Sequence, residues 1–429
     1  MSEQRPKIVR IIARLNVGGP AKHVVWLTAG LDDFDTLLVT GSVPPGEGDM
    51  SYFAEQASIV PHVIPEMSRE ISFHDITTIW KLYRLFLKEK PDLVHTHTAK
   101  AGTVGRLAGL LYRWFTLRVL IGRPRKARFV HTYHGHIFHS YYGALKTKLF
   151  ITIERALALL ITDRIVVISD QQEVEINQTF HVGQPQQIKV IPLGLDLDIF
   201  RNYSSRRNRF RSELGVDQGT IVVGIVGRLA DVKNHQLFIN VVRRYKHIKS
   251  SAQPTVRFAV IGDGPLRESL ETQCRSLDLT QDVIFCGERD DPEYFYPALD
   301  IVALSSRNEG TPLTLIEGMA NARPVIATRV GGVVDLLGST VEDGVFKVCE
   351  RGISVPPGDA DAYAQGLDRL IVDEELRANV AAQGHQFVQA KYPKDRLLAD
   401  IRSLYDELLK PQLSAITTRS AGHGVHSRV

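Results

Sequence analysis

Two series of short, β-branched apolar segments, separated by helix-length stretches, constrain the fold of this chain most. The first series covers residues 8–12, 36–40, 92–96, 128–132, 164–168 and 188–191, and the second covers 220–226, 256–261, 283–286, 301–304 and 324–327. Short, continuously apolar segments are typical of parallel strands that are buried on both faces. Their alternation with helices predicts an α/β fold with doubly wound sheets, and two series predict two Rossmann-like domains.

The turn-rich segment Ile191–Asp196 separates the two series and is expected to act as a hinge. We therefore predict a first domain over residues 1–193 and a second over 205–392. An amphipathic helix at about 393–410 is expected to cross back onto the first domain. Residues 411–429 are rich in Ser, Thr, Gly and His and are expected to form a flexible tail. The length of 429 residues agrees with two or three domains.

Composition and charge exclude several classes of protein. The hydrophobic fraction of 44% and charged fraction of 23% are those of a soluble globular protein, and a net charge of +4 is too small to indicate a nucleic-acid partner. No uncharged apolar run approaches the roughly 20 residues that a membrane-spanning helix needs, and the N-terminus does not resemble a secretory signal. The cysteines Cys274, Cys286 and Cys349 lack metal-binding spacing, so we expect a reduced, cytoplasmic protein.

The most informative motif is the segment Asn308–Ala320, which reads NEGTPLTLIEGMA. It places the carboxylates of Glu309 and Glu317 at either end of a predicted helix start, with Gly310 in the loop. One acid on each side of an anion site suggests a nucleotide-sugar site, in which one carboxylate binds sugar hydroxyls and the other binds ribose hydroxyls. The alternative is an ordinary loop-to-helix junction with solvated acids.

The predicted helix start has the features of a phosphate site. Thr311 is expected to be the N-cap, and Pro312 then falls at the first helical position, where a missing N–H is harmless. The amides of Leu313 and Thr314 would then point outward, unpaired, at the positive end of the helix dipole. Such a helix start suits a phosphate.

Two further loops follow predicted strands. Gly18 and Gly19 allow the backbone to approach a ligand closely, although the loop lacks the third glycine and the acid of a dinucleotide fingerprint. Arg228 and Lys233 leave the first strand of the second domain and are expected to converge on a diphosphate. A pair of solvated surface charges is the alternative for these two cations.

Histidines are concentrated in the first domain: His95, His97, His131, His134, His136 and His139. The His-x-His spacing invites a zinc interpretation, but acidic and cysteine ligands are missing nearby, so we expect no metal site. One imidazole after the strand at 128–132 can bond to a sugar hydroxyl or assist proton movement. The other histidines are expected to pack in the interior or support that imidazole.

Residues 106–128 interleave basic and apolar side chains. The segment begins with Arg106, and its other basic residues are Arg113, Arg118, Arg123, Arg125, Lys126 and Arg128. This mixture suits peripheral contact with an anionic membrane surface. The alternative is a core helix with a solvated basic edge.

Taken together, these residues resemble the retaining glycosyltransferases of family 4, which have the GT-B fold. The most specific element is the pair Glu309 and Glu317, with seven residues between them. The segments Gly227–Asn234, Val330–Gly332 and Val355–Asp359 support the resemblance. Asp335 departs from the family, where glutamate is more frequent. The segment His95–Gly102 resembles bacterial enzymes that build cell-surface polysaccharide on lipid carriers.

The resemblance implies a role for each site residue. It assigns Glu309 to the donor sugar, Glu317 to the ribose, and Arg228 and Lys233 to the donor diphosphate. The histidine that precedes a glycine in the family matches His134 best, with His136 as the second choice for the residue that faces the sugar.

We therefore predict an enzyme that moves a hexosyl or N-acetylhexosaminyl group from a UDP-sugar to a hydroxyl of a glycan or lipid-linked acceptor, with retention. No metal or cofactor is expected, and the protein is expected to be cytoplasmic or peripheral on the inner membrane face. Catalysis is assigned to His134, Glu309, Arg228 and Lys233. Donor binding is assigned to Gly18, Gly19, Arg228, Lys233, Gly310, Thr311, Leu313, Thr314 and Glu317. A GT-B sugar-nucleotide epimerase and a non-catalytic nucleotide-sugar-binding protein are the alternatives.

Overall fold

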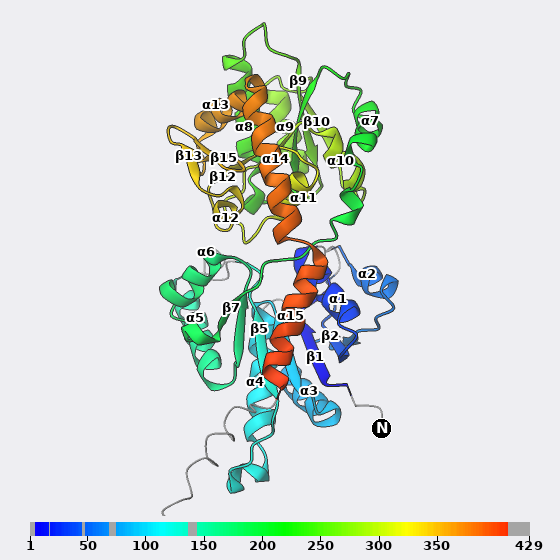
Figure 1. Ribbon diagram of the computed structural model, residues 1–429, viewed down its shortest axis with the longest axis vertical. Helices are drawn as coiled ribbons and strands as arrows, with labels where there is room; N and C mark the ends of the chain where they lie inside the picture. The colour runs from blue at the N-terminus through cyan, green and yellow to red at the C-terminus, as the bar shows by residue number, and fades with distance from the viewer. Residues whose placement is uncertain (1–4, 17, 45–47, 68–73, 136–143, 411–429) are drawn as a thin grey trace, which may run out of the picture.

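The computed structural model describes residues 5–16, 18–44, 48–67, 74–135 and 144–410. The chain forms two α/β lobes stacked along the long axis of the molecule (Figure 1). The predicted tail at 411–429 and the histidines His136 and His139 lie outside the described residues. Among the helices described, none combines the length and apolar content needed to cross a bilayer.

The first lobe contains a seven-stranded parallel sheet with the order β3-β2-β1-β4-β5-β6-β7. Its strands are β1 (Lys7–Ile12), β2 (Asp35–Thr40), β3 (His62–Val63), β4 (Leu93–His97), β5 (Arg128–Thr132), β6 (Arg164–Val167) and β7 (Ile188–Val190). Its helices are α1 (Gly19–Gly30), α2 (Ser51–Gln56), α3 (His74–Glu89), α4 (Ala99–Trp114), α5 (Ala144–Leu160) and α6 (Asp170–Glu173). The short helices η1 (Leu117–Ile121), η2 (Val174–Thr179) and η3 (Pro185–Gln187) complete the lobe.

The second lobe contains an eight-stranded sheet with the order β10-β9-β8-β11-β12-β15-β14-β13. Its strands are β8 (Ile221–Val226), β9 (Val256–Ile261), β10 (Val283–Gly287), β11 (Ile301–Leu304), β12 (Val325–Thr328), β13 (Thr340–Glu342), β14 (Lys347–Cys349) and β15 (Gly352–Val355). Pairing is parallel except where β14 meets β13 and β15. Both sheets are doubly wound, which confirms the predicted α/β class.

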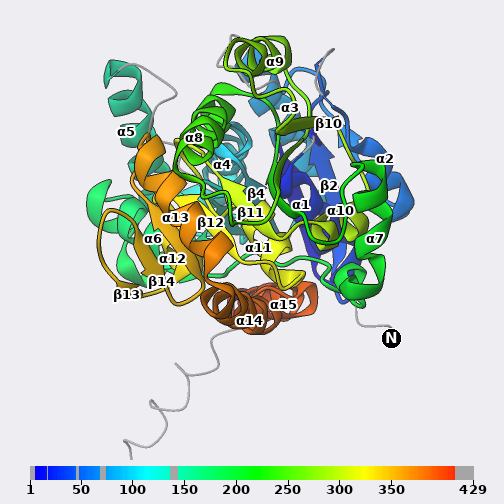
Figure 2. The same cartoon turned by 90° about the horizontal axis from the view of Figure 1, so that it is seen from above.

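Helices cover both faces of the second sheet and link the two lobes. They are η4 (Asp198–Phe200), α7 (Tyr203–Glu213), η5 (Asp231–Lys233), α8 (His235–Ile248), α9 (Arg267–Ser276), α10 (Pro292–Ala298), α11 (Leu313–Ala320), α12 (Val333–Leu337), α13 (Ala360–Val372), α14 (Glu374–Lys391) and α15 (Lys394–Leu409). Figure 1 shows α14 on the second lobe and α15 on the first, one after the other along the long axis, and Figure 2 shows both on the same flank of the molecule.

Helix α15 returns to the first lobe, although it follows the last helix of the second. Its Leu397, Ile401 and Leu404 belong to a buried cluster with Ile8 and Leu27 of the first lobe. Because amphipathic helices gain most of their stability from burying one apolar face, this packing holds the end of the chain on the first lobe.

The two crossings between the lobes are hydrogen-bonded to one another. The amide of Leu195 donates to the carbonyl of Tyr392 at 2.8 Å, and the amide of Lys394 donates to the carbonyl of Leu195 at 2.9 Å. The predicted hinge segment is therefore paired with the chain that precedes α15.

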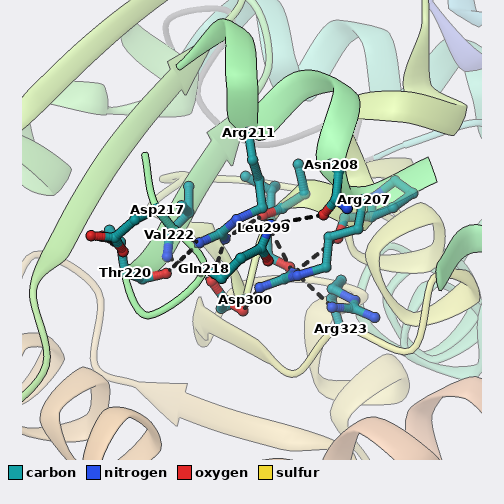
Figure 3. A network of polar contacts seen from close by, with 12 residues as sticks. Arg207, Asn208, Arg211, Asp217, Gln218, Thr220, Val222, Leu299, Asp300 and Arg323 are labelled. Carbon is teal, nitrogen blue, oxygen red and sulfur yellow. Dashed lines mark hydrogen bonds and ion pairs between the residues drawn. The ribbon is translucent and has the colours of Figure 1, made fainter. Parts of the chain in front are cut away.

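A cluster of arginines holds α7 against the start of β11 (Figure 3). Asp300 accepts from Arg207 at 2.5 Å and from Arg211 at 3.1 Å. The same two guanidiniums donate to carbonyls at the end of α10, where cations suit the negative end of the helix dipole. Arg323 adds a bond to the carbonyl of Leu299 at 3.2 Å. Since these groups satisfy one another, we assign the cluster to structure.

A fully buried ion pair joins α4 and α5 in the first lobe. Arg106 donates through Nη2 to both carboxylate oxygens of Glu154, at 2.7 and 2.6 Å, and both side chains are 0% exposed. The hydroxyl of Tyr133 also donates to Glu154. Arg106 therefore belongs to the core, and its assignment to a basic surface segment was wrong at this residue.

Candidate functional site

The topology brings distant loops together at the carboxyl edge of each sheet. In the first sheet β1 lies between β2 and β4, and in the second sheet β8 lies between β9 and β11. At such a point the crossovers leave in opposite directions, and ligands of doubly wound folds bind there. The loops at these positions carry Gly18 and Gly19 after β1, and Lys233 and Glu309 after β8 and β11.

Lys233 and Glu309 form the central ion pair of the second lobe. Lys233 Nζ lies 2.7 Å from Glu309 Oε1, and the two side chains are 25% and 10% exposed. The hydroxyl of Ser306 donates to the same carboxylate oxygen at 2.6 Å. Lys233 also lies over Gly227, where an added Cβ would meet its Cε at 3.7 Å. The pair is therefore held in place by the strand ends around it.

Arg228 lies beside this pair in sequence but is not part of it. Its side chain is exposed and forms no hydrogen bond or ion pair with the described residues. The guanidinium is thus available to a ligand.

The start of α11 differs from the prediction by one residue. Pro312 is the N-cap, with φ −71° and ψ 114°, and the helix begins at Leu313, so the placement of Thr311 at the cap and of Pro312 inside the helix was wrong. The reason is tertiary packing, because a Cβ at Gly332 would meet the carbonyl oxygen of Gly310 at 2.0 Å. This close approach fixes the turn before the helix in a way that capping preference does not anticipate.

The corrected helix start still leaves polar groups without partners. The first amides to donate within the helix are those of Leu315 and Ile316, which both donate to the carbonyl of Pro312. The amides of Leu313 and Thr314 come before them and have no hydrogen-bond acceptor within the helix. The hydroxyls of Thr311 and Thr314 are buried and lack a partner among the described residues. A bound anion would satisfy these groups.

Glu317 lies one turn deeper in α11 and accepts a hydrogen bond from the hydroxyl of Tyr296 at 2.7 Å. Burial raises the pKa of Glu317 above its usual value, while the charge of Lys22 opposes that shift. Lys22 belongs to α1 of the first lobe. The electrostatics of Glu317 therefore depend on both lobes.

Two close contacts bring the lobes together around these residues. A Cβ at Gly19 would lie 2.9 Å from Leu313 Cδ1, and a Cβ at Gly310 would lie 3.0 Å from the carbonyl oxygen of His134. The glycines of the first loop thus face the start of α11, and the loop after β5 faces Gly310. We refer to this arrangement as the inter-lobe site, made of Gly19, Lys22, His134, Gly135, Lys233, Glu309, Gly310, Leu313 and Glu317.

His134 occupies the first-lobe side of the inter-lobe site. Its Nε2 lies 3.0 Å from Nδ1 of His97, and burial lowers the pKa of His134 to about 3. The imidazole is therefore neutral at physiological pH and offers one donor and one acceptor.

Two other histidines are bonded within the first lobe. His95 contacts the hydroxyls of Tyr405 and Thr132 at 2.6 and 2.7 Å, and His131 contacts the hydroxyl of Thr96 at 2.9 Å. They have the packing role that the sequence predicted for them.

Two family models match this chain, one to each lobe. The model described as Glycosyltransferase Family 4 matches residues 17–199, and the model described as Glycosyl transferases group 1 matches residues 206–387. The matches include the loops that form the inter-lobe site. The chain is a glycosyltransferase of family 4.

Two curated relatives of this glycosyltransferase come from bacteria. It is 28% identical over 321 residues to the UDP-Gal:alpha-D-GlcNAc-diphosphoundecaprenol alpha-1,3-galactosyltransferase of Escherichia coli, with 74% of this chain and 76% of the relative covered. It is 29% identical over 357 residues to the capsular polysaccharide biosynthesis glycosyltransferase CapM of Staphylococcus aureus, with 82% and 86% covered.

A solved structure with the same fold is Anabaena HepE in complex with UDP. The TM-score is 0.75 at 21% identity, with 94% of this chain and 100% of HepE covered. At this identity the likeness shows the fold alone, and it confirms the predicted GT-B architecture of the glycosyltransferase.

Sequence reasoning about this glycosyltransferase singled out neither Lys22, His23, Tyr296 nor Ser306. Tyr296 and Ser306 hold the two glutamates, and Lys22 and His23 lie on α1 directly after the glycine loop. The available signal for the α1 residues was their position just after the first strand of a doubly wound sheet. For Tyr296 the sequence carried no comparable signal.

Proposed function

We propose that this glycosyltransferase moves a sugar from a UDP-sugar to a hydroxyl of a glycan or lipid-linked acceptor with retention of configuration. The observation that carries the proposal is the Lys233–Glu309 pair at 2.7 Å, next to Gly310, which abuts the His134–Gly135 backbone of the other lobe. A UDP complex of a structure with the same fold and a UDP-Gal-dependent relative with a lipid-linked acceptor support it.

In the proposed reaction, the second lobe binds the leaving group. Lys233, Arg228 and the free amides at the start of α11 stabilise the negative charge that develops on the diphosphate. Glu317 accepts hydrogen bonds from the ribose hydroxyls. We propose that these protein cations and amides stabilise the charge and that transfer requires no metal.

The remaining site residues position the sugar. Glu309 accepts from the sugar hydroxyls, and neutral His134 donates to a hydroxyl from the opposite lobe. The bond from the anomeric carbon to the donor phosphate breaks as the acceptor oxygen bonds to that carbon on the same face. The acceptor proton passes to the leaving phosphate oxygen, so no enzyme nucleophile is required.

The proposal is tested by incubating the full chain with UDP-sugars and a short-chain GlcNAc-diphospholipid acceptor. We expect one UDP-sugar to raise the melting temperature and to yield UDP and a glycosylated lipid whose new linkage keeps the donor configuration in NMR spectra. Release of a rearranged free sugar without acceptor would indicate an epimerase instead. Donor binding without turnover on a panel of acceptors would indicate a non-catalytic binding protein.

A projecting segment at the far end of the first lobe is the proposed membrane contact. Trp114, Phe115, Leu120 and Ile121 are 49%, 73%, 83% and 69% exposed, and we call these four residues the apolar tip. Figure 1 shows α4 and the chain that follows it extending beyond the sheet at the bottom of the view. Exposed aromatic and aliphatic groups in one place are typical of an interaction surface.

Four basic residues of this segment, whose side chains the structure describes, fall into two sets. Arg113 bonds to Asp163 at 3.1 Å and Arg125 lies over the ring of Tyr112 at 5.0 Å, so both hold the segment together. Arg123 and Lys126 are exposed beside the apolar tip. We infer that the tip inserts into a bilayer interface while these two cations meet anionic lipid headgroups.

Vesicle sedimentation measures this contact. We expect the full chain to sediment with vesicles that contain phosphatidylglycerol, more than with phosphatidylcholine alone, and less as salt increases. Leu120→Asp is expected to abolish most of this binding because it places a charge in the apolar tip. Val60→Asp, at a residue that is 90% exposed elsewhere on the same lobe, is the matched control. Sedimentation that is independent of anionic lipid, or unchanged in Leu120→Asp, would contradict the assignment.

A further inference from the structure

Three histidines from separate elements meet beside the inter-lobe site. His23 lies on α1, His97 ends β4 and His134 follows β5. One ring nitrogen of each lies within 4.8 Å of those of the other two. We propose that this trihistidine cluster binds a divalent transition-metal ion such as Zn²⁺, and that the bound ion inhibits transfer by occupying His134.

Four of the six ring nitrogens in this cluster have no hydrogen-bond partner among the described residues, and the other two, His97 Nδ1 and His134 Nε2, contact each other. His23 is 2% exposed, and neither of its ring nitrogens is hydrogen-bonded to a described residue. The same holds for Nε2 of His97 and Nδ1 of His134. Buried polar groups nearly always have partners, so the unpaired imidazole of His23 is consistent with a ligand site at this position.

The spacing fits metal coordination. A Zn–N bond is about 2.0–2.1 Å, so two nitrogens on one tetrahedral ion lie roughly 3.4 Å apart. The nitrogens of His97 and His134 are already 3.0 Å apart. The ion would replace the hydrogen bond between these two rings, and His23, whose ring nitrogen lies within 4.8 Å of the other two, would provide the third ligand. A fourth position would remain open, as in other His₃ zinc sites.

Three imidazole ligands determine which class of metal ion would bind. Three imidazoles favour Zn²⁺, Cu²⁺, Ni²⁺ or Co²⁺, whereas Mg²⁺ and Ca²⁺ require oxygen ligands. Nearby charged groups are cations, since Arg10 acts electrostatically on both His23 and His97, and Arg396 acts on His23. Arg10 opposes a second positive charge, so we expect binding that a chelator reverses readily.

The inhibitory effect rests on the function proposed above, while metal binding does not. The carbonyl of His134 adjoins Gly310, which is next to the Lys233–Glu309 pair. An imidazole that coordinates an ion cannot also reorient to bond with a sugar hydroxyl. Zinc is therefore expected to lower transfer, and a chelator is expected to restore it.

The binding test uses tag-free full-length protein that has been stripped with a chelator and then titrated with Zn²⁺ alone by calorimetry. We expect one ion per chain. Co²⁺ in its place is expected to give the visible absorption of a tetrahedral site. His23→Asn is expected to weaken binding by more than about tenfold and to abolish the Co²⁺ spectrum, since even residues that only support metal ligands change affinity by about 10–100-fold.

A matched control separates this cluster from surface histidines. His62→Asn removes an exposed imidazole on β3 of the same lobe and is expected to leave binding unchanged. If His23→Asn does not fold, His97→Gln provides the same test at a second ligand. Unchanged affinity in the folded cluster variant, or no stoichiometric binding to the native chain, would overturn the metal site. Stoichiometric binding by a chain that transfers sugar equally well with and without zinc would overturn its inhibitory role.

Discussion

Replacing Lys233 by alanine is expected to lower kcat/KM for sugar transfer by at least about 10²–10³-fold, the range seen when one preorganised charge-stabilising donor is removed. Lys233 is held 2.7 Å from Glu309 at the second switch point, where its charge faces the proposed diphosphate. The loss is expected in kcat as well as in donor binding, because the negative charge on the phosphate grows as the sugar leaves. Steady-state assays with the donor found by thermal shift measure both quantities.

The control for Lys233→Ala is Lys246→Ala, which also removes a lysine from an ion pair with a carboxylate. Lys246 pairs with Asp282 at 2.9 Å on the outer surface of the second lobe. We expect Lys246→Ala to transfer sugar normally and both variants to melt cooperatively. Near-normal transfer or donor hydrolysis by Lys233→Ala would remove this lysine from the mechanism.

Replacing Glu154 by alanine is expected to destabilise the chain by about 3–5 kcal/mol, the range found when one partner of a buried ion pair is removed. Arg106 would remain 0% exposed with its charge unpaired, and Tyr133 would lose the acceptor of its hydroxyl. Denaturant unfolding followed by circular dichroism measures the change. We also expect the replacement to lower sugar transfer, because Tyr133 lies between the end of β5 and His134 of the inter-lobe site.

A double replacement separates the effect of an unpaired buried charge from the effect of lost side-chain volume. Arg106→Met with Glu154→Leu is expected to recover much of the lost stability, since it leaves no buried charge uncompensated. Arg201→Ala breaks a 2.9 Å pair with Asp198 whose side chains are 76% and 72% exposed, and it is expected to change stability little. If Glu154→Ala were as stable as Arg201→Ala, the buried pair would not hold α4 and α5 together.

The sequence was sufficient to predict the central strands. β5, β9 and β11 begin and end at the predicted residues, because both faces of a central parallel strand are buried and its sequence is rich in β-branched and apolar residues. The two predicted series did not include β3, β13, β14 or β15. The first three are two or three residues long, and β3 and β13 are exposed along their length, so no apolar run marks them. β15 is buried, but it has only four residues, two of which are Gly352 and Ser354.

The site was less predictable where tertiary contacts override local preference. Thr311 has the side chain of a good N-cap, yet the approach of Gly332 to Gly310 moves the cap to Pro312. Arg106 lies in a basic stretch but is buried against Glu154. His23 meets His97 and His134 only because the strand order brings three loops to one edge, which residue spacing does not encode.

The paired crossings at Leu195 and Pro393 have a mechanical consequence. Because these two segments are hydrogen-bonded to each other, we expect them to restrict sliding of one lobe over the other more than a single unpaired linker would. We expect the lobes to move as a hinge about this pair of crossings. Substrate entry and product release would then separate Lys22 from Glu317 and bring them together again along the same path.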